Sequence, residues 1–433
     1  MKTFTDKLIF LLLISSFGPY ISISLGLKVD SVVIFLGGFL YILLLFSRKE
    51  IVAHKNLMNL FVIWVGLFAY LFFRTLIYGG SMSTSSFVAE IKNFLQPVFL
   101  IAFFALVLRK QDALQTEQLL SKAGRWLLIL LSLNTLWIFL SFFIDLTVIN
   151  QYFWRGADSV AHRAAQMGRY SGVFNQPIES GVAYSLGLFV WTYLMDVSKK
   201  KLKIRNIFTL ILLIIGGSLS VSKVFVIFGL ALFILYAFSV KAIRGQLFKL
   251  AILFAGIFTP IYLYLTKTWD GINYLFRLFD SSNYQQQGIL TLLTAGRYGS
   301  GDSQQNQYFE RIMRESPLMG EGLGSQEIYD SAFFHMFSSG GILALGLYVL
   351  LLCALLWSVY QFYFYAYKRP EFKFFFCLVL LTIVGGLGAP VLTLNRSSVI
   401  LWVLIGLTLQ FLSVYVQEKR NALQDDETKT KIA

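Results

Sequence analysis

Charged residues are scarce in this sequence, and so are the residues that build common catalytic centres. Only 14% of the 433 residues are charged, and the chain has two cysteines and three histidines. The cysteines, Cys353 and Cys377, lie in apolar segments and form no CxxC motif, so no disulfide framework is expected. The sequence contains no HExxH motif, no clustered carboxylates and no GxxxxGK[ST] phosphate loop. We therefore expect no metal and no cofactor, and an energy source outside this chain.

Apolar residues are correspondingly abundant. They make up 57% of the sequence, aromatic residues make up 17%, and the mean hydropathy is +0.67. They occur in continuous runs of about 17 to 25 residues, the length that a helix needs to cross about 30 Å of hydrocarbon. Because a chain in lipid must satisfy its own backbone hydrogen bonds, these runs predict helices. The predicted fold is all-α, a polytopic membrane bundle of about 12 transmembrane helices.

The runs predict transmembrane spans at defined positions. They lie near 8–26, 31–47, 57–73, 93–108, 126–146, 178–197, 206–221, 224–240, 250–266, 331–358, 374–391 and 399–416. The first run resembles a signal peptide, but no small-residue cleavage site follows it and a second run starts almost at once. We therefore expect it to be a retained first helix.

The distribution of basic residues predicts the orientation. Placing both termini in the cytoplasm puts most Lys and Arg residues inside, including the cluster at 199–205, as the positive-inside rule requires. This predicts a multi-pass protein of the bacterial inner (plasma) membrane, and the net charge of +14 then indicates topology and contact with anionic lipid rather than binding of nucleic acid. The predicted organisation is one integral membrane domain, 1–433. It carries two large extracytoplasmic loops, 147–177 and 267–330, and a cytoplasmic tail, 417–433.

The two faces also differ in the kind of basic residue. The predicted inner segments hold 17 Lys and 7 Arg, whereas the predicted outer segments hold 4 Lys and 9 Arg. Lys suffices for topology, but the planar guanidinium of Arg grips phosphate or carboxylate with two hydrogen bonds. We infer an anionic ligand on the outer side; the alternative is that these arginines pair with acids of the same loops. The outer arginines are Arg74, Arg155, Arg163, Arg169, Arg277, Arg297, Arg311, Arg314 and Arg396.

The two long outer loops are the candidate functional segments, because long connections in a compact protein usually carry function. Residues 306–316 of the second loop have helical spacing, with Tyr308, Phe309, Ile312 and Met313 on one side and Arg311 and Arg314 on another. Pro317 and the glycines at 320, 322 and 324 are expected to end that helix and to leave a flexible, backbone-exposed loop.

Motifs in these loops resemble those of a known family. The first loop ends with Gly168-Arg-Tyr-Ser-Gly-Val-Phe-Asn-Gln-Pro177, and the second holds Ala295-Gly-Arg297 followed by Ser316-Pro-Leu-Met-Gly-Glu-Gly322. Arg311 stands eleven positions before Gly322, and Gly341-Ile-Leu follows Asp330 at the start of the next span. In this order the motifs resemble the O-antigen polymerase (Wzy) and O-antigen ligase family of polytopic glycosyltransferases. The ligases typically carry His where this chain has Asp330.

The resemblance implies a GT-C-like, metal-independent membrane glycosyltransferase. Such an enzyme joins oligosaccharide repeat units, carried on undecaprenyl diphosphate, into a surface polysaccharide of the O-antigen or capsule type at the outer face of the inner membrane. The partners it implies are this lipid-linked oligosaccharide, membrane lipid and a polysaccharide chain-length regulator, with no nucleic acid. In this chemistry the diphosphate leaves the anomeric carbon and needs positive charge, while the acceptor hydroxyl needs a base.

The resemblance also assigns roles to individual residues. It makes Asp330, Arg169 and Arg297 the catalytic candidates, with Asp330 as the first choice of base and Glu179 and Glu327 behind it. The candidates for contact with the diphosphate or the glycan are Arg311, Arg314, Glu179, Gly322 and Asn175. An insertion-like segment, 299–303, makes the spacing after Arg297 longer than the family pattern.

Structural alternatives stay open for several of these residues. Arg169 could brace the first loop against Glu179, and Arg311 could pair with its neighbours Glu310 or Glu315. Asp330 could be the N-cap of the helix that begins at 331. Outside the assigned set, His335 is expected to be a packing residue, and Arg396 is expected to snorkel toward the membrane interface.

Two other functions compete with polymerisation. A ligase that transfers finished chains to a lipid acceptor is disfavoured by Asp330 in place of His. A flippase or transporter of the lipid-linked unit is disfavoured because such proteins usually show two related halves, whereas this sequence shows no internal repeat and very unequal loops.

Overall fold

The structure analysed is a computed structural model of the chain. The residues it describes are 2–22, 27–46, 55–78, 84–108, 112–154, 156, 159–199, 203–246, 304–325 and 331–432. Within these ranges the protein is all-α apart from one short hairpin, with 15 α-helices and a π-helical turn. The predicted span at 250–266 and the predicted site residues Arg297, Glu327 and Asp330 lie outside the described residues.

The helices follow the apolar runs of the sequence. The first nine are α1 (Lys2–Ser16), α2 (Val29–Phe46), α3 (Lys55–Tyr78), α4 (Thr84–Val107), α5 (Ala113–Leu140), α6 (Thr147–Trp154), α7 (Val160–Gln166), α8 (Pro177–Ser198) and α9 (Ile204–Leu219). The later elements are the π-helical turn η1 (Val224–Gly229), α10 (Leu230–Ser239), α11 (Lys241–Arg244), α15 (Gln304–Glu315), α16 (Ala332–Ala366), α17 (Pro370–Gly385) and α18 (Asn395–Ile432). Strands β1 (Tyr20–Ser22) and β2 (Leu27–Lys28) pair antiparallel.

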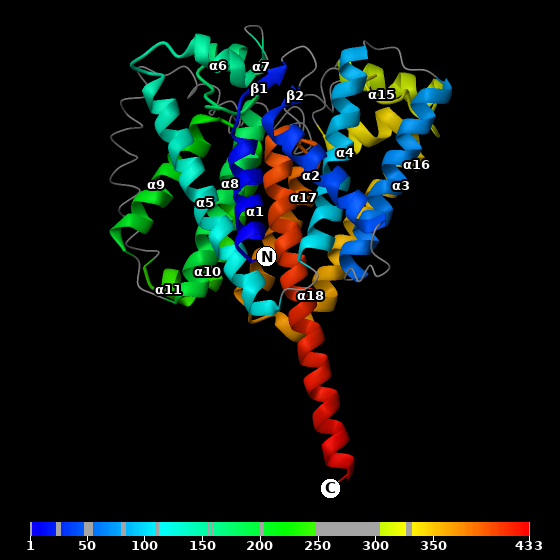
Figure 1. Ribbon diagram of the computed structural model, residues 1–433. Helices are drawn as coiled ribbons and strands as arrows, with labels where there is room; N and C mark the ends of the chain where they lie inside the picture. The colour runs from blue at the N-terminus through cyan, green and yellow to red at the C-terminus, as the bar shows by residue number, and fades with distance from the viewer. Residues whose placement is uncertain are drawn as a thin grey trace, which may run out of the picture.

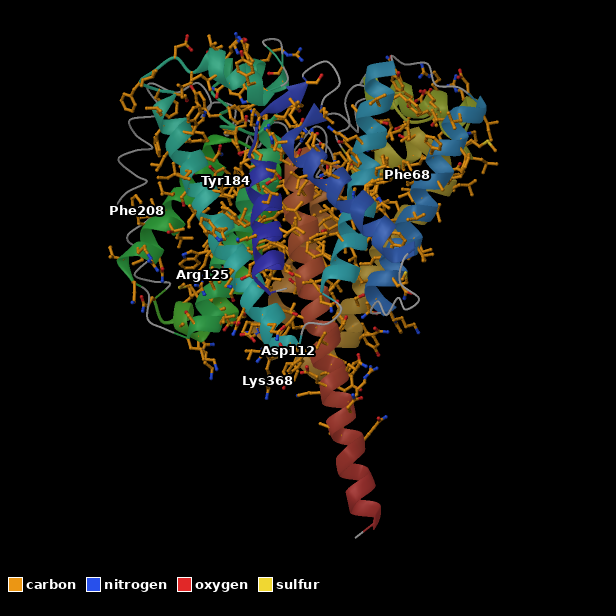
Figure 2. All side chains as sticks on the ribbon, viewed as in Figure 1. Phe68, Asp112, Arg125, Tyr184, Phe208 and Lys368 are labelled. Atoms are coloured by element: carbon orange, nitrogen blue, oxygen red, sulfur yellow. The ribbon has the colours of Figure 1, made fainter. Side chains whose placement is uncertain are left out.

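The long helices form a bundle with two distinct ends (Figure 1). Helices α6, α7 and α15 lie at one end, which we call the loop end. The N-terminus, α11 and the distal part of α18 lie at the opposite end, which we call the terminal end. Asp112 and Lys368 mark the terminal end among the side chains drawn in Figure 2.

Helix α18 is the centre of the bundle. It packs against α4, α5, α8 and α17. In its most apolar stretch 83% of the residues are buried, against 28% for α3, which lies at the periphery. Beyond Val416 the helix continues as an exposed rod past the terminal end, so the described part of the predicted tail is helical (Figure 1).

Five helices are long and apolar enough to cross a membrane, which indicates a multi-pass membrane protein. They cover Lys55–Ile77, Phe87–Phe104, Ala113–Leu140, Ala332–Ala366 and Asn395–Gln424. Shorter apolar helices coincide with three further predicted spans, at Val29–Phe39, Ile204–Leu219 and Val224–Ser239. The count of twelve spans stays a prediction.

Three predicted spans end earlier in the structure than the sequence suggested. The first run was expected to be helical to residue 26, but α1 ends at Ser16 and the chain turns into β1. Pro19 lacks an N–H and disfavours helix in the residue before it, which accounts for this end. Helix α5 ends at Leu140 rather than near 146, and α17 ends at Gly385 rather than near 391, where Gly386 follows.

Helix α4 begins nine residues earlier than predicted, at Thr84 instead of 93. The residues that the prediction left out, 84–92, include Glu90 and Lys92. In the structure both side chains are buried among neighbouring helices. Apolar content therefore underestimates a helix whose polar face points into the protein.

Helix α16 is broken near its beginning. Gly340 has φ −143° and ψ 16°, and Gly341 has φ +64°, so residues 332–339 form a short buried helix and the long span starts at Ile342. The N-cap is Ser331, whose hydroxyl accepts a hydrogen bond from the Phe334 N–H at 3.5 Å. The alternative in which Asp330 is the N-cap of this helix was therefore wrong, because the N-cap is the next residue, Ser331.

Candidate functional site

The described candidate residues all lie at the loop end, in two groups. Arg169, Asn175 and Glu179 belong to the end of the first loop and the start of α8. Arg311 and Arg314 lie on α15, and Gly322 lies in the turn that follows it. Contacts through α4 and α18 connect the two groups.

Arg169 lies in the turn after α7. Its N–H donates to the Ala164 carbonyl at 2.9 Å, and a guanidinium N–H donates to the Val221 carbonyl at 3.3 Å. The next residue, Tyr170, donates its N–H to the Leu219 carbonyl at 2.8 Å. Arg169 is thus half-buried and is held against the connection between α9 and η1.

Helix α5 holds the end of the first loop through the side chain of Asn134. Asn134 accepts a hydrogen bond from the Val173 N–H at 2.8 Å and donates to the hydroxyl of Tyr184 at 3.0 Å. Figure 2 shows Tyr184 inside the bundle. On the other side, the Trp154 indole donates to the Gly172 carbonyl at 2.7 Å. These contacts fix the loop backbone beside Arg169.

Glu179 is fully buried in the first turn of α8. One carboxylate oxygen accepts from the Asn175 N–H at 2.9 Å, and the other accepts from the Arg396 N–H at 2.5 Å. The carboxylate therefore closes the turn before Pro177 and attaches α8 to the start of α18. The side-chain carbonyl of Asn175 is buried and has no hydrogen-bond partner among the described residues.

The expectation that Arg396 snorkels toward the membrane interface was wrong. Its side chain is fully buried, and its guanidinium donates to the backbone carbonyls of Phe153 at 3.1 Å, Gly18 at 2.7 Å and Val173. The guanidinium therefore connects the first loop, the β-hairpin region and α18. No local signal distinguishes Arg396 from a snorkelling arginine, because the carbonyls that accept its hydrogen bonds come from distant parts of the chain.

Two further charges lie in the same buried region. Lys28 Nζ lies 3.7 Å from the carboxylate of Asp30, and both side chains are almost fully buried. Burial lowers the pKa of Lys28, and the negative charge of Asp30 opposes that shift. We call Lys28, Asp30, Glu179 and Arg396 the charge cluster. Its two positive and two negative charges balance, as burial of charge requires.

The charge cluster leads to a stability prediction. In Arg396→Met the side chain keeps an unbranched apolar stem but loses the guanidinium, so three backbone carbonyls lose their donor and the free energy of unfolding should fall by about 1–3 kcal/mol. The thermal midpoint of the purified protein in detergent measures this. Arg244→Met, at an exposed position of α11, is the control and should leave the midpoint unchanged. An unchanged midpoint for Arg396→Met would show that the cluster does not hold the loop end together.

The second group is organised by the turn 317–325, which we call the glycine turn. It docks at the break in α16: the N–H groups of Glu321 and Gly322 donate to the carbonyls of Ser338 and Ser339 at 2.7 and 2.9 Å. In return, the Ile342 N–H donates to the Pro317 carbonyl at 2.9 Å. The turn thus satisfies backbone groups that the broken helix leaves without partners. The sequence motif at 316–322 and the glycine at 341 are parts of one backbone interface.

Helices α3 and α4 hold the other side of the glycine turn. Arg74 donates to the Gly320 carbonyl, and Thr75 Oγ1 accepts from the Leu323 N–H at 2.9 Å. The carboxylate of Glu90 accepts from the Gly324 N–H at 2.5 Å. The turn is therefore clamped between α3, α4 and α16.

Glu90 also faces His335 of the short buried helix, with 3.4 Å between Glu90 Oε1 and His335 Nε2. The imidazole ring lies 5.6 Å from that of Phe94, and both partners of the pair are buried. His335 is thus more than the packing residue that the sequence indicated, because it contacts a carboxylate. Glu90 was missed because the predicted span began after it.

The prediction of a helix near 306–316 is confirmed by α15. Arg311 does not pair with Glu310 or Glu315; its Nε donates to Glu321 of the glycine turn at 2.9 Å, and its guanidinium lies 4.2 Å from the centre of the Tyr308 ring. Contacts with Tyr308 and then Glu321 raise the pKa of Arg311. Arg314 is mostly exposed and lies 3.6 Å from Glu310.

The two groups are connected through α4 and α18. Gln96, on the same helix as Glu90, donates to the Asn395 carbonyl at 3.4 Å, and Asn395 precedes Arg396. Buried polar contacts therefore extend from the glycine turn to the charge cluster. Among the described residues, no group of His, Cys, Asp and Glu could hold a metal ion.

Comparisons with known proteins add no assignment. No model of a protein family matches the sequence, and no curated protein matches it.

Proposed function

We propose that this protein polymerises a surface polysaccharide, joining oligosaccharide repeat units that are linked to undecaprenyl diphosphate. The single observation that carries the proposal is the arrangement of the two motif windows. Residues 168–179 and 311–341 are far apart in sequence, resemble the polymerase motifs in order, and are both anchored at the loop end by buried polar contacts.

In the proposed reaction, the acceptor sugar hydroxyl attacks the anomeric carbon of a lipid-linked unit. The bond from that carbon to the diphosphate oxygen breaks, undecaprenyl diphosphate leaves with the bonding electrons, and the hydroxyl proton passes to a base. Asp330 is the proposed base, and Arg169, Arg297, Arg311 and Arg314 are the proposed source of positive charge for the diphosphate. The reaction balances without a metal or a cofactor.

The contacts assign supporting roles to other predicted residues. Both carboxylate oxygens of Glu179 already accept backbone N–H groups, so we assign it to positioning of Arg169 and the first loop rather than to proton transfer. Gly322 similarly uses its N–H to dock the glycine turn. The buried side-chain carbonyl of Asn175 supports its proposed role at the glycan. The pair Glu90 and His335 is a further positioning element, because it holds the glycine turn close to the position of Ser331.

The proposal includes an orientation in the membrane. The loop end faces the outer side of a bacterial inner membrane, twelve spans cross it, and both termini lie in the cytoplasm. The partners are the lipid-linked oligosaccharide, membrane lipid and a regulator of chain length.

Cysteine accessibility tests the orientation. In a variant without Cys353 and Cys377, a membrane-impermeant thiol reagent added to intact cells with a permeabilised outer membrane should label Ser159→Cys and Ser303→Cys but not Ser198→Cys. After the inner membrane is opened, Ser198→Cys should react, because Ser198 is exposed. Labelling of Ser198→Cys alone in intact cells would reverse the orientation and remove every assignment to the outer face.

Substitution of Arg169 tests the diphosphate contact. Lys keeps the positive charge but loses the planar pair of donors, so Arg169→Lys should reduce polymerisation about tenfold or more, which corresponds to the loss of one charged hydrogen bond. The yield and thermal midpoint of the protein should stay unchanged. The control is Arg163→Lys on α7, where the side chain is exposed. Wild-type polymerisation by Arg169→Lys would leave this arginine with a role in topology only.

The function as a whole is tested in a deletion strain by analysis of its lipid-linked saccharides. Loss of a polymerase leaves single repeat units transferred to the final acceptor. Loss of a ligase accumulates long polymer on undecaprenyl diphosphate, and loss of a flippase retains single units on the cytoplasmic side. Single capped units, restored to long chains by the wild-type gene, are the expected result; either of the other patterns contradicts the proposal.

A further inference from the structure

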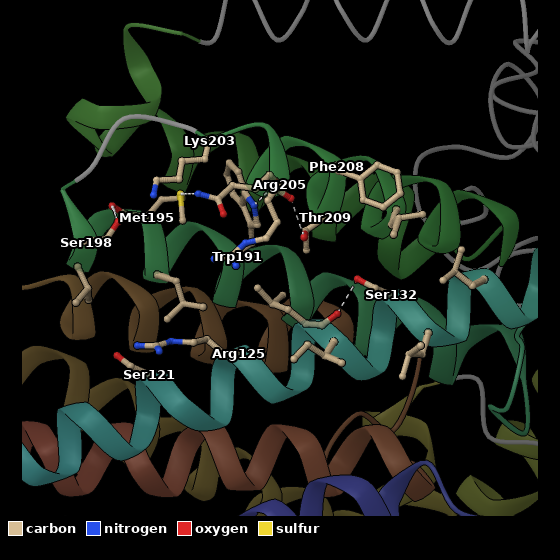
Figure 3. A pocket seen from close by; sticks show the side chains of 18 residues that line it. Ser121, Arg125, Ser132, Trp191, Met195, Ser198, Lys203, Arg205, Phe208 and Thr209 are labelled. Carbon is tan, nitrogen blue, oxygen red and sulfur yellow. Dashed lines mark hydrogen bonds between the residues drawn. The ribbon is translucent and has the colours of Figure 1, made fainter.

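A groove far from the loop-end site runs between α5, α8 and α9 (Figure 3). Its volume is about 770 Å³, within the range of about 300–1,000 Å³ typical of ligand pockets. The basic residues of its lining gather toward one end. The labels of Arg125, Lys203 and Ser198 lie toward one end in Figure 3, and Phe208 and Ser132 lie toward the other.

The polar end is strongly basic. It is lined by Arg125 of α5 and by Lys203 and Arg205 at the start of α9, and all three side chains are exposed. Within the described part of the chain none of the three forms an ion pair. The acids nearest along the same helices have other partners: Glu117 lies 2.9 Å from Arg369, and Asp196 lies 2.9 Å from Lys373.

The start of α9 strengthens this positive end. No side chain caps the helix at Lys203, and two of the three basic residues, Lys203 and Arg205, stand at this helix start. The N–H groups of a helix start and the helix dipole favour an anion, and phosphate is the anion most often bound in this way. Three cations from two helices line this end around the uncapped start of α9, which favours phosphate as its ligand.

The rest of the groove is apolar and open to the surroundings of the bundle. Ile129, Leu133 and Leu136 follow one another along α5 and are each about half exposed, at 47%, 55% and 48%. Phe208, on the facing side of α9, is 57% exposed. A continuous apolar wall that starts at a cluster of cations has the amphipathic form of a phospholipid, with the headgroup at one end and an acyl chain along the helices.

We propose that this groove binds an anionic phospholipid. The lipid phosphate contacts Arg125, Lys203 and Arg205, and one acyl chain lies along Leu133 and Phe208 between α5 and α9. Basic pockets between transmembrane helices bind anionic headgroups in this manner. The site serves to fix α9 against α5 and is separate from the loop-end chemistry. In the proposed orientation the bound lipid belongs to the cytoplasmic leaflet. This is the only part of the proposal that rests on the proposed function.

The test uses the full-length protein in nanodiscs of phosphatidylethanolamine with phosphatidylglycerol as the minor component. Native mass spectrometry measures the lipid that stays bound after detergent extraction. The wild type should retain phosphatidylglycerol in preference to phosphatidylethanolamine. The variant Arg125→Gln/Lys203→Gln/Arg205→Gln should retain it at least about tenfold less, because each cation contributes to binding of an anionic headgroup.

A matched control removes the same charge at the terminal end outside the groove. Lys241→Gln/Arg244→Gln/Lys368→Gln changes three exposed residues and should retain the lipid as the wild type does. Leu133→Trp fills the apolar part without changing charge and should also lower retention. The proposal is overturned if the control variant loses as much phosphatidylglycerol as the groove variant, or if Leu133→Trp retains all of it. Either result would mean that the lipid is held by the general positive charge of the surface and not by this groove.

Two further outcomes do not depend on how the variants fold. If wild-type protein holds phosphatidylethanolamine as firmly as phosphatidylglycerol, the basic end does not select its ligand and the proposal is wrong. If lipid extracted from protein purified from its native membrane is a polyprenyl phosphate instead of a phospholipid, the groove belongs to the carrier lipid and the proposal is likewise overturned. Enrichment of anionic phospholipid in both preparations supports it.

Discussion

Gly341→Ala should disconnect the glycine turn from α16 and abolish most of the polymerising activity. A Cβ at this position would lie 2.3 Å from the carbonyl carbon and oxygen of Leu318, which are backbone atoms and cannot rotate away. The φ of +64° adds strain for any residue other than glycine. Together the left-handed conformation and the overlap should cost about 2–5 kcal/mol. The thermal midpoint in detergent and the length of polymer in cells measure the two consequences.

The same helix provides the control for this substitution. Gly346 lies five positions later in α16, and a Cβ added there meets nothing within 4 Å. Gly346→Ala should therefore leave activity unchanged and raise the thermal midpoint slightly, because Ala favours helix over Gly. If Gly341→Ala behaved like Gly346→Ala, the docking of the glycine turn would have no part in the function.

Asp330→Asn should lower polymerisation by about 10²–10⁴-fold, the usual contribution of a general base. Asn has the same size but does not accept the proton from the acceptor hydroxyl. Ser331 supplies the N-cap of α16, so the substitution should not weaken the start of that helix. Cells with the variant should contain mostly single repeat units, which gel analysis of their polysaccharide would show, while the protein level should equal that of the wild type.

Asp145→Asn is the control for Asp330→Asn. Asp145 also lies at the loop end, where hydrogen bonds with Thr147 lower its pKa, and it has no place in the proposed reaction. Its neutralisation should leave the polymer unchanged. Normal long-chain polymer from Asp330→Asn would exclude Asp330 as the base and transfer the role to Glu327, since Glu179 is engaged with backbone N–H groups.

Features encoded in short stretches could be predicted from the sequence. Each continuous apolar run that the structure describes contains a helix, although three of these helices end before the run does, and the spacing of Tyr308, Arg311 and Ile312 predicted α15. Pro317 and the glycines after that helix correctly predicted its end, but the expectation of a flexible, backbone-exposed loop was wrong, because the glycine turn is largely buried and docked on α16. In each case the controlling interaction is local, either a backbone preference or the hydrophobicity of a single segment.

Features that depend on distant partners were missed. Arg396 is buried because Gly18, Phe153 and Val173, from other parts of the chain, offer carbonyl groups to it. Glu90 can lie inside the protein because a backbone N–H of the glycine turn and His335 meet it there. A sequence alone shows the cost of burying such a residue but not the partner that offsets the cost. The predicted locations of Arg396 and Glu90 were therefore wrong, because each of these polar residues joins separate segments of the chain.

The most direct test of the proposed function is polymerisation by the purified protein. The protein is placed in nanodiscs with undecaprenyl-diphosphate-linked repeat units from its own source, and the products are separated by chain length. We predict a ladder of lipid-linked chains, one undecaprenyl diphosphate released for each new glycosidic bond, no requirement for a metal ion or nucleotide, and loss of the ladder in Asp330→Asn. Substrate that binds to the protein but stays as single units, with no diphosphate carrier released, would contradict the account.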